Sequence, residues 1–239
     1  MKGRVLILGG TAPARLVCAE VSGLDVVASL AGVTDAPARL AVPVRIGGFG
    51  GEAGFRAALG GVSAVLDATH PFAARISARA VRVCGEMGLP YLRLTRPPWP
   101  TRAGWRHHAD GEAAAAAIAA GARVFLSTGP GSLPAFEERR LDITCRRIDP
   151  APERAGVRWI LGRPPFTLEA ETALFATLGI TDLVTKNAGG PAPKLDAAGV
   201  LGLRVHVIDR PRGLGGEETH DIDRAIAFVR THAADRNRG

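Results

Sequence analysis

The sequence predicts an α/β protein made of two Rossmann-like domains, each with a doubly wound parallel sheet. Apolar runs alternate with helical patterns along the whole chain, which is typical of a parallel sheet flanked by helices. The apolar run at residues 4–8 leads into Gly9-Gly10-Thr11 and a helical stretch, and residues 123–129 repeat residues 4–10 position for position. A chain with two such turns can hold a nucleotide and a second anionic ligand.

A proline-rich segment at residues 96–100 separates the two halves of the chain. It reads Arg-Pro-Pro-Trp-Pro, and its three prolines remove backbone donors and fix φ, so neither a helix nor a central strand can pass through it. We interpret it as a linker and expect an N-terminal domain at residues 1–97 and a C-terminal domain at residues 98–239.

The first half alternates between strand and helix signals. Apolar, β-branched runs predict strands at residues 4–8, 25–30, 42–46, 64–68 and 91–94. Helices are expected between them at residues 12–22, 52–59 and 73–87.

The second half repeats this scheme. Strands are expected at residues 122–127, 142–148, 157–161, 182–185 and 204–208, and helices at residues 112–119, 132–139, 167–178, 194–201 and 220–232. The helix at 167–178 carries an apolar stripe opposite its acids, and Gly179 directly after it is a typical C-terminal stop.

The bulk composition is that of a globular protein in a reducing compartment. The 239 residues are 46% hydrophobic and 22% charged, which is ample for a buried core. No apolar run is long enough for a signal peptide or a membrane span, so we expect a cytoplasmic protein that does not bind membranes. Three unpaired cysteines without metal spacing are expected to be small buried hydrophobes.

The net charge of +7 has two functional explanations. Nucleic-acid binding calls for basic clusters interleaved with aromatic residues, but here the arginines are dispersed and tyrosine occurs once. We therefore expect no nucleic-acid partner and favour a small polyanionic substrate held by guanidinium groups. A compositional bias toward arginine over lysine explains much of the same usage.

Ligands of parallel sheets bind beyond the carboxyl ends of the strands, so the residues there are the candidates for chemistry. In the first half the candidate substrate contacts are Gly9, Gly10, Thr11, Arg15, Gly48, Phe49, Gly50, His70, Arg93 and Arg96. The glycines around Phe49 allow a flat ligand to approach the backbone, although such a cluster is also typical of a flexible turn. His70 precedes a proline, which favours a strand-to-helix corner, where it can bind a carboxylate, transfer a proton or bond only to the backbone.

In the second half a weak dinucleotide-binding pattern follows a strand. The candidate coenzyme contacts are Thr128, Gly129, Gly131 and Ser132, with a leucine where the third glycine of the usual fingerprint would stand. Arg147 ends the next strand, where NADP enzymes carry an arginine and NAD enzymes an acid, so the pattern favours NADP. The alternative is that Arg146 and Arg147 only decorate an edge strand.

Lys186 follows a strand of the second half and can reach an anion or deliver a proton, although loop lysines are often only solvated. Other chemistries lack their motifs. The sequence contains neither a GxSxG nucleophile elbow nor a P-loop, and no residues with metal-ligand spacing, so no metal is expected.

Taken together, the turns resemble the precorrin-6A reductase family of cobalamin biosynthesis. The matching stretches are residues 7–11 with Arg15, 47–51, 67–73, 93–99, 127–133, and 183–190 with Lys194 and Leu195. Two positions differ from the family pattern: Val33 stands where an arginine is frequent after the second strand, and Pro13 where a glutamate is frequent in the first turn.

The resemblance implies one domain for NADPH, one for the tetrapyrrole, and terminal strands exchanged between them. It implies hydride transfer from NADPH to C19 of precorrin-6A and protonation at C18 to give precorrin-6B, with His70, Lys186 or a bound water as the proton donor. Basic residues would clamp the many carboxylates of the substrate, and the product would pass transiently to the next enzyme. The two ligands could also occupy the opposite halves, and the substrate could be metal-free or contain cobalt.

Two other functions fit the residues. One is an NADP-dependent reductase of another polyanionic substrate, and the other is an NADP-sensing protein without turnover.

Overall fold

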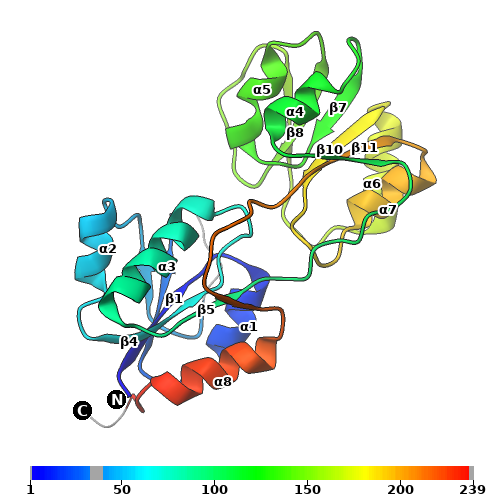
Figure 1. The fold of residues 1–239 in the computed structure, drawn as a ribbon. Helices are drawn as coiled ribbons and strands as arrows, with labels where there is room; N and C mark the ends of the chain where they lie inside the picture. The colour runs from blue at the N-terminus through cyan, green and yellow to red at the C-terminus, as the bar shows by residue number, and fades with distance from the viewer. Residues whose placement is uncertain (1, 33–39, 237–239) are drawn as a thin grey trace. The chain divides into compact units, whose positions relative to one another are not determined.

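The computed structural model describes residues 2–32 and 40–236 (Figure 1). It divides into two compact units, one formed by Met1–Pro97 with Pro211–Gly239 and the other by Pro98–Arg210. Each unit contains a six-stranded sheet whose strand pairs are all parallel. The α/β class with two Rossmann-like sheets is therefore confirmed. In the described ranges, no helix combines the length and apolar character needed to span a bilayer.

The first unit has its helices on both faces of the sheet (Figure 1). Its strands are β1 (Arg4–Leu8), β2 (Val26–Leu30), β3 (Val44–Ile46), β4 (Val62–Asp67), β5 (Tyr91–Leu94) and β12 (Glu217–Thr219), in the spatial order β12-β5-β4-β1-β2-β3. Helices α1 (Ala12–Glu20) and α8 (Ile222–His232) pack on one face, and α2 (Glu52–Ala58) and α3 (Ala74–Met87) on the other.

The second unit repeats this architecture. Its strands are β6 (Trp105–His108), β7 (Arg123–Leu126), β8 (Asp142–Arg147), β9 (Val157–Leu161), β10 (Asp182–Lys186) and β11 (Arg204–Ile208), in the order β6-β11-β10-β7-β8-β9. Helices α6 (Leu168–Thr177) and α7 (Pro193–Val200) pack on one face, and α4 (Gly111–Ala116) and α5 (Pro134–Glu137) lie on the other (Figure 1).

Each sheet has one edge strand that pairs with a strand far away in the sequence. β6 follows the first five strands along the chain but pairs with β11, and β12 follows β11 but pairs with β5. The terminal strands are therefore exchanged, as expected. By internal contacts the second unit runs from Pro98 to Arg210, and the chain from Pro211 onward groups with the first unit.

Both sheets have the same switch in strand order. In each sheet the chain first adds strands on one side of a central strand and then adds strands on its other side. The strand order therefore reverses between β1 and β4 in the first sheet and between β7 and β10 in the second. Open α/β sheets bind ligands beyond the carboxyl ends of the strands at this point. The turns after these four strands are therefore the first places to look for a site.

Two details of the secondary structure differ from the sequence prediction. The short strands β6 and β12 were not expected, and the helix expected at 132–139 consists of a 3₁₀ turn at Pro130–Ser132 and the four-residue α5. The three cysteines are buried, as expected, and burial raises the pKa of each thiol to about 11.

Candidate functional site

The first turn, after β1, is a tightly fixed helix start. The Thr11 hydroxyl caps α1 by accepting from Ala14 N (3.2 Å) and donates to Ala68 O (2.8 Å), which ties the turn to the strand end of β4. Gly9 and Gly10 precede it, with Gly10 at φ 118° and exposed. Arg15 is exposed on α1. The turn therefore combines open backbone with a nearby cation, while the hydroxyl of Thr11 has a structural role.

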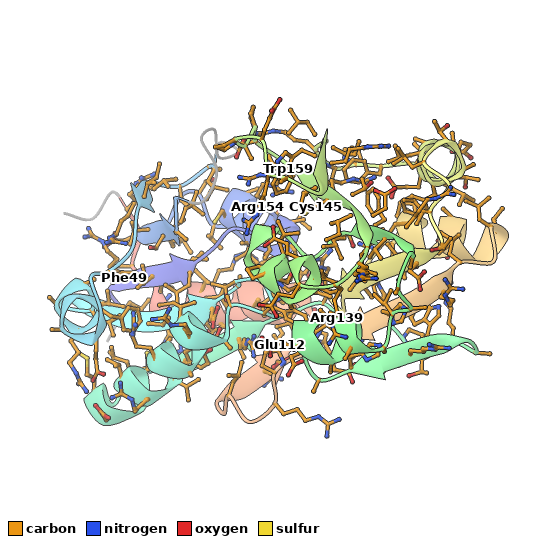
Figure 2. All side chains as sticks on the ribbon, turned by 90° about the horizontal axis from the view of Figure 1, so that it is seen from above. Phe49, Glu112, Arg139, Cys145, Arg154 and Trp159 are labelled. Atoms are coloured by element: carbon orange, nitrogen blue, oxygen red, sulfur yellow. The ribbon has the colours of Figure 1, made fainter. Side chains whose placement is uncertain are left out.

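The glycine loop after β3 contains the expected contacts Gly48, Phe49 and Gly50. Gly48 and Gly50 are exposed, and a Cβ built on either would meet no other described part of the chain within 4 Å. Phe49 is half-buried, and its ring packs edge-on against Phe55 of α2, with centroids 4.9 Å apart (Figure 2). The loop thus has an open surface on a packed aromatic base.

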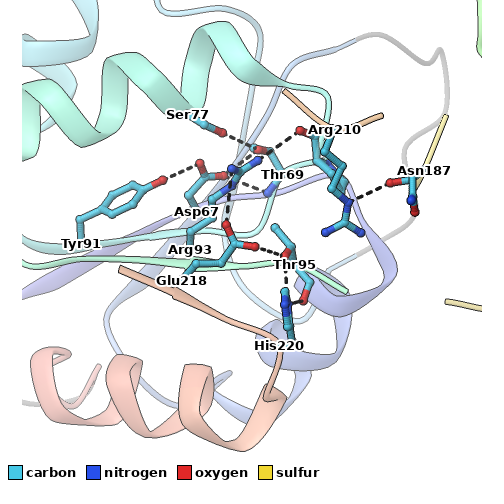
Figure 3. Close-up of polar contacts among 11 residues, drawn as sticks. Asp67, Thr69, Ser77, Tyr91, Arg93, Thr95, Asn187, Arg210, Glu218 and His220 are labelled. Atoms are coloured by element: carbon cyan, nitrogen blue, oxygen red, sulfur yellow. Dashed lines mark hydrogen bonds and ion pairs between the residues drawn. The ribbon is translucent and has the colours of Figure 1, made fainter. Parts of the chain in front are cut away.

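A buried carboxylate organises the turn after β4 (Figure 3). Asp67 is fully buried and accepts hydrogen bonds from Thr69 N (3.0 Å), Thr69 Oγ1 (2.7 Å) and the Tyr91 hydroxyl (2.9 Å). Burial and the adjacent Asp67 charge raise the pKa of Tyr91, so its hydroxyl remains a donor. Thr69 also lies 3.3 Å from the Ser77 hydroxyl on α3. This network fixes the chain on the N-terminal side of His70.

His70 lies at the corner between β4 and α3, as expected. Its Nδ1 accepts from Phe72 N at 3.2 Å, so the neutral ring carries its proton on Nε2. The ring is half-buried, and its centroid lies 5.8 Å from that of Phe72. The backbone contact orients the imidazole, and its catalytic or binding role stays a prediction.

Arg93 and Arg96, expected as carboxylate anchors, are placed differently. Arg93 is 5% exposed, donates to Pro71 O (3.3 Å) and lies 3.7 Å from Glu218 of β12 (Figure 3). Glu218 in turn accepts from the Thr95 hydroxyl at 2.6 Å. Arg93 therefore holds the His70 corner from inside the sheet. Arg96 is half-buried, and burial lowers the pKa of its guanidinium.

In the second unit, the turn after β7 is closed by hydroxyl contacts. Ser132 Oγ donates to Thr128 Oγ1 (2.5 Å) and to Gly129 O (3.1 Å), and Thr128 is buried. Gly129 has φ 79°, and a Cβ built on exposed Gly131 would meet no other described part of the chain within 4 Å. The leucine in place of the third glycine, Leu133, is fully buried. The turn is thus compact with an open outer surface.

The two arginines at the end of β8 have different environments. Arg146 forms two hydrogen bonds with buried Glu171 of α6 (2.7 and 3.1 Å) and lies between the rings of Phe125 and Phe166. Arg147 donates to Asp149 O (3.2 Å), and its guanidinium carbon lies 5.2 Å from the ring centre of Trp159.

Arg146 is therefore part of the core. The neighbouring side chain of Arg147 lies at the carboxyl end of the sheet beside Trp159, an aromatic residue that Figure 2 shows on the adjacent strand.

Lys186 is the last residue of β10, at the second switch point. It is half-buried, and burial lowers the pKa of its ammonium group. The loop after it is held by the linker, because Trp99 N donates to Asn187 Oδ1 (2.8 Å) and the Trp99 indole donates to Gly190 O (2.6 Å). Arg210 Nε also donates to Asn187 O (2.8 Å). Lys186 is therefore carried on a fixed strand end.

Within each unit, the structure brings the expected residues to the carboxyl end of one sheet. Asp67, Tyr91, Trp99, Asn187 and Glu218 were not assigned roles from the sequence, and they act by holding these turns in place. Of the two departures from the family pattern, Val33 lies outside the described residues, and Pro13 is buried in the first turn of α1. Within the described ranges, no group of three or more histidine, cysteine or acidic side chains is arranged to hold a metal ion.

Comparisons with known proteins agree along the whole length of the chain. The family model described as "Precorrin-6x reductase CbiJ/CobK" matches residues 4–230. The precorrin-6A reductase of Mycobacterium tuberculosis (strain ATCC 25618 / H37Rv) is 44% identical over 237 residues, covering 95% of this chain and 97% of that one. The cobalt-precorrin-6A reductase of Priestia megaterium is 32% identical, with 87% and 91% covered.

A solved structure, "CobK precorrin-6A reductase", matches the fold with a TM-score of 0.90 at 40% identity and covers 99% of both chains. A family model and relatives that extend over nearly every residue leave one conclusion: the chain belongs to the precorrin-6A reductase family, whose members are oxidoreductases.

Proposed function

We propose that the protein uses NADPH to reduce precorrin-6A to precorrin-6B in the cytoplasmic biosynthesis of cobalamin. The observation that carries the proposal is the pair of switch points. Each is flanked by an open glycine turn, and each has a cationic residue nearby in the sequence: Arg15 on the helix that follows β1, and Lys186 at the end of β10. The relatives named precorrin-6A reductase, which are more identical in sequence than the cobalt-precorrin-6A reductase of Priestia megaterium, support precorrin-6A as the proposed substrate.

The second unit has the donor chemistry that NADPH requires. The Thr128 and Ser132 hydroxyls hold this turn together, and the open space above exposed Gly131 leaves room for a ligand against its backbone. Arg147 ends the adjacent strand, where the 2′-phosphate of NADP is held in related folds, and no acid occupies that position. In this proposal the turn binds the pyrophosphate and Arg147 binds the 2′-phosphate, which selects NADPH over NADH. NADPH supplies the hydride.

The first unit has features suited to a flat, carboxylate-rimmed macrocycle. The turn at Gly9, Gly10 and Thr11 and the loop with Gly48, Phe49 and Gly50 present exposed backbone on which a planar ring can lie. Arg15 and Arg96 are the proposed carboxylate anchors of this unit, and Lys186 of the second unit is proposed as a further anchor, since a guanidinium or ammonium group binds a carboxylate through charge-assisted hydrogen bonds. Arg93 contributes by holding Pro71, next to His70.

Proton delivery to C18 is assigned to His70 or Lys186. The Nδ1 contact with Phe72 leaves Nε2–H of the neutral His70 ring as a hydrogen-bond donor to the substrate, and proton delivery from His70 would require the imidazolium form. Burial lowers the pKa of Lys186, which makes its ammonium group a better proton donor than a solvated lysine. Most of the catalysis would come from aligning the ligands and excluding water.

A coenzyme-oxidation assay tests the proposal. Purified protein is mixed with NADPH and precorrin-6A, and the loss of the reduced nicotinamide absorbance is followed. We expect oxidation that depends on precorrin-6A and is much slower with NADH. Oxidation only with a different polyanionic acceptor would contradict the assigned substrate. Binding of NADPH without any oxidation would instead indicate a sensor.

A further inference from the structure

One arginine that the proposed chemistry does not use lies under the glycine loop of the first unit. Arg45 is the middle residue of β3, a three-residue strand at the end of its sheet. Its Nη1 donates to Gly47 O (2.8 Å) and to Ser29 Oγ (3.2 Å), and its Nη2 donates to Gly48 O (2.7 Å). A single guanidinium group therefore connects two consecutive loop carbonyls to the neighbouring strand β2.

The same side chain also supports the aromatic residue of the loop. The Arg45 guanidinium carbon lies 4.0 Å from the ring centre of Phe49, and Phe49 packs edge-on against Phe55. On the other side, a Cβ on Gly54 would lie 1.7 Å from Phe49 O, so the loop backbone passes directly over the first turn of α2. The loop is therefore held by contacts with both Arg45 and α2.

We infer that Arg45 is a positioning residue for the tetrapyrrole, because it holds the Gly47–Gly51 loop in the shape that receives the macrocycle. This inference rests on the proposed function, which places the substrate against Gly48, Phe49 and Gly50. The hydrogen bonds of the Arg45 guanidinium go to acceptors of the protein, so Arg45 shapes the surface that the ligand contacts. In the described part of the chain, no carboxylate pairs with it, and its charge also favours an anionic ligand nearby.

The geometry requires an arginine and not merely a positive charge. A planar guanidinium group presents several N–H donors in fixed directions, whereas a lysine ammonium is a compact donor on a flexible stem. Lysine at this position would keep the charge but could not bridge Gly47 O, Gly48 O and Ser29 Oγ together. The pair of variants Arg45→Lys and Arg45→Ala therefore separates the contribution of the charge from that of the fork.

The state of the loop can be measured without any substrate. Chymotrypsin cuts after aromatic residues, and cleavage after Phe49 gives fragments of known mass. We expect Arg45→Ala to raise the rate of this cleavage by about tenfold or more, because a loosened loop opens locally more often. Arg45→Lys should lie between wild type and Arg45→Ala. The matched control is Arg4→Ala, which removes an exposed arginine paired with Asp25 in the same unit.

Kinetics then test the role in substrate binding. We expect Arg45→Ala to raise KM for precorrin-6A by about tenfold while KM for NADPH changes by less than about twofold, and Arg4→Ala to behave as wild type. An unchanged KM for precorrin-6A in Arg45→Ala, or equal increases in both KM values, would overturn the inference. So would cleavage after Phe49 at the wild-type rate.

If wild-type protein fails to oxidise NADPH with precorrin-6A, the proposed function fails, and the loop loses its assigned ligand with it. The proteolysis of Arg45→Ala then still decides whether Arg45 holds the loop, so the two failures are distinguishable.

Discussion

At the scale of single residues, Lys186 is the most direct test of the substrate site. It ends β10 at a switch point, and burial lowers the pKa of its ammonium group. We expect Lys186→Ala to raise KM for precorrin-6A by about one to two orders of magnitude, which corresponds to the loss of one charged contact. Lys186→Arg keeps the charge and should recover part of the binding. A KM equal to that of wild type in both variants would remove Lys186 from the site.

Arg147 tests the coenzyme site. Its neighbour Arg146 is paired with Glu171 in the core, whereas Arg147 lies beside Trp159 at the strand end. We expect Arg147→Ala to weaken NADPH binding by about tenfold or more, because a charged contact with the 2′-phosphate is lost, while NADH binding changes little. The comparison uses dissociation constants for the two coenzymes. Equal weakening of both would assign Arg147 to a structural role.

The sequence identified residues that its motifs place at strand ends, and it missed those that support them. Gly9 directly follows a strand, Lys186 ends one, and His70 lies in the turn three residues after one, so their position is readable from local sequence. Arg45 bonds to Ser29 and Trp99 bonds to Asn187, and such contacts depend on which strands and loops become neighbours in space. Arg93 was expected to bind a substrate carboxylate; the structure buries it 3.7 Å from Glu218, a neighbour that local sequence does not reveal, and its role toward a ligand stays a prediction.

At the scale of elements, the pair Arg146–Glu171 connects β8 to α6. The Glu171 side chain is 2% exposed, and Arg146 is enclosed by two aromatic rings. We expect Glu171→Ala to lower the free energy of unfolding by about 3–5 kcal/mol, because it leaves a buried guanidinium without its partner. Urea denaturation measures the change.

The control is the double variant Arg146→Met with Glu171→Leu, which removes both charges together. It should recover most of the stability lost in Glu171→Ala. If the double variant is no more stable than the single one, the loss arises from packing and not from the unpaired charge.

Strands β6 and β11 contain a buried histidine contact that makes stability depend on pH. His206 is fully buried, lying 3.2 Å from Asp182 and 3.0 Å from His108. Burial lowers the pKa of both histidines below the ordinary value of 6.5, so unfolding increases their proton affinity. The contribution of the two neutral histidines to the free energy of unfolding is therefore fully present above pH 6.5. It is lost as the pH falls toward their pKa values in the folded state.

We expect the urea midpoint of wild-type protein to be lower at about pH 5 than at about pH 7.5. The variant His206→Asn should show a smaller difference between the two pH values, whatever its absolute stability. The control is His220→Asn, at an exposed histidine, and it should keep the wild-type difference in urea midpoint between the two pH values. A difference that is unchanged in His206→Asn would assign the pH dependence to other groups.

Hydrophobic periodicity in the sequence predicted the longer helices and strands but not the short strands. Strands such as β1 and β7 are nearly continuous apolar runs, because a central parallel strand is covered on both faces. In contrast, β6 is Trp-Arg-His-His and β12 is Glu-Glu-Thr, and both lie at the ends of their sheets. Edge strands need little apolar sequence, so nothing local marks them as strands.

At the scale of the whole molecule, the exchange of β6 and β12 makes each sheet depend on a distant part of the chain. The resemblance to a family implied this exchange, whereas the proline-rich linker alone predicted a second domain made of residues 98–239. Strand pairing between residues 91–94 and 217–219 is a long-range contact that leaves no periodic signal in either segment. The internal repeat of residues 4–10 at 123–129 did predict that both sheets share one architecture.

The central claim is that this molecule transfers a hydride from NADPH to the precorrin-6A macrocycle. Transfer can be followed with NADPH deuterated at the transferable position of the nicotinamide ring, in ordinary water, with the product examined by mass spectrometry and NMR. We expect a single deuterium from the coenzyme at C19 of the product and a solvent proton at C18. A reduced product without coenzyme deuterium, or deuterium at C18 in place of C19, would contradict this account.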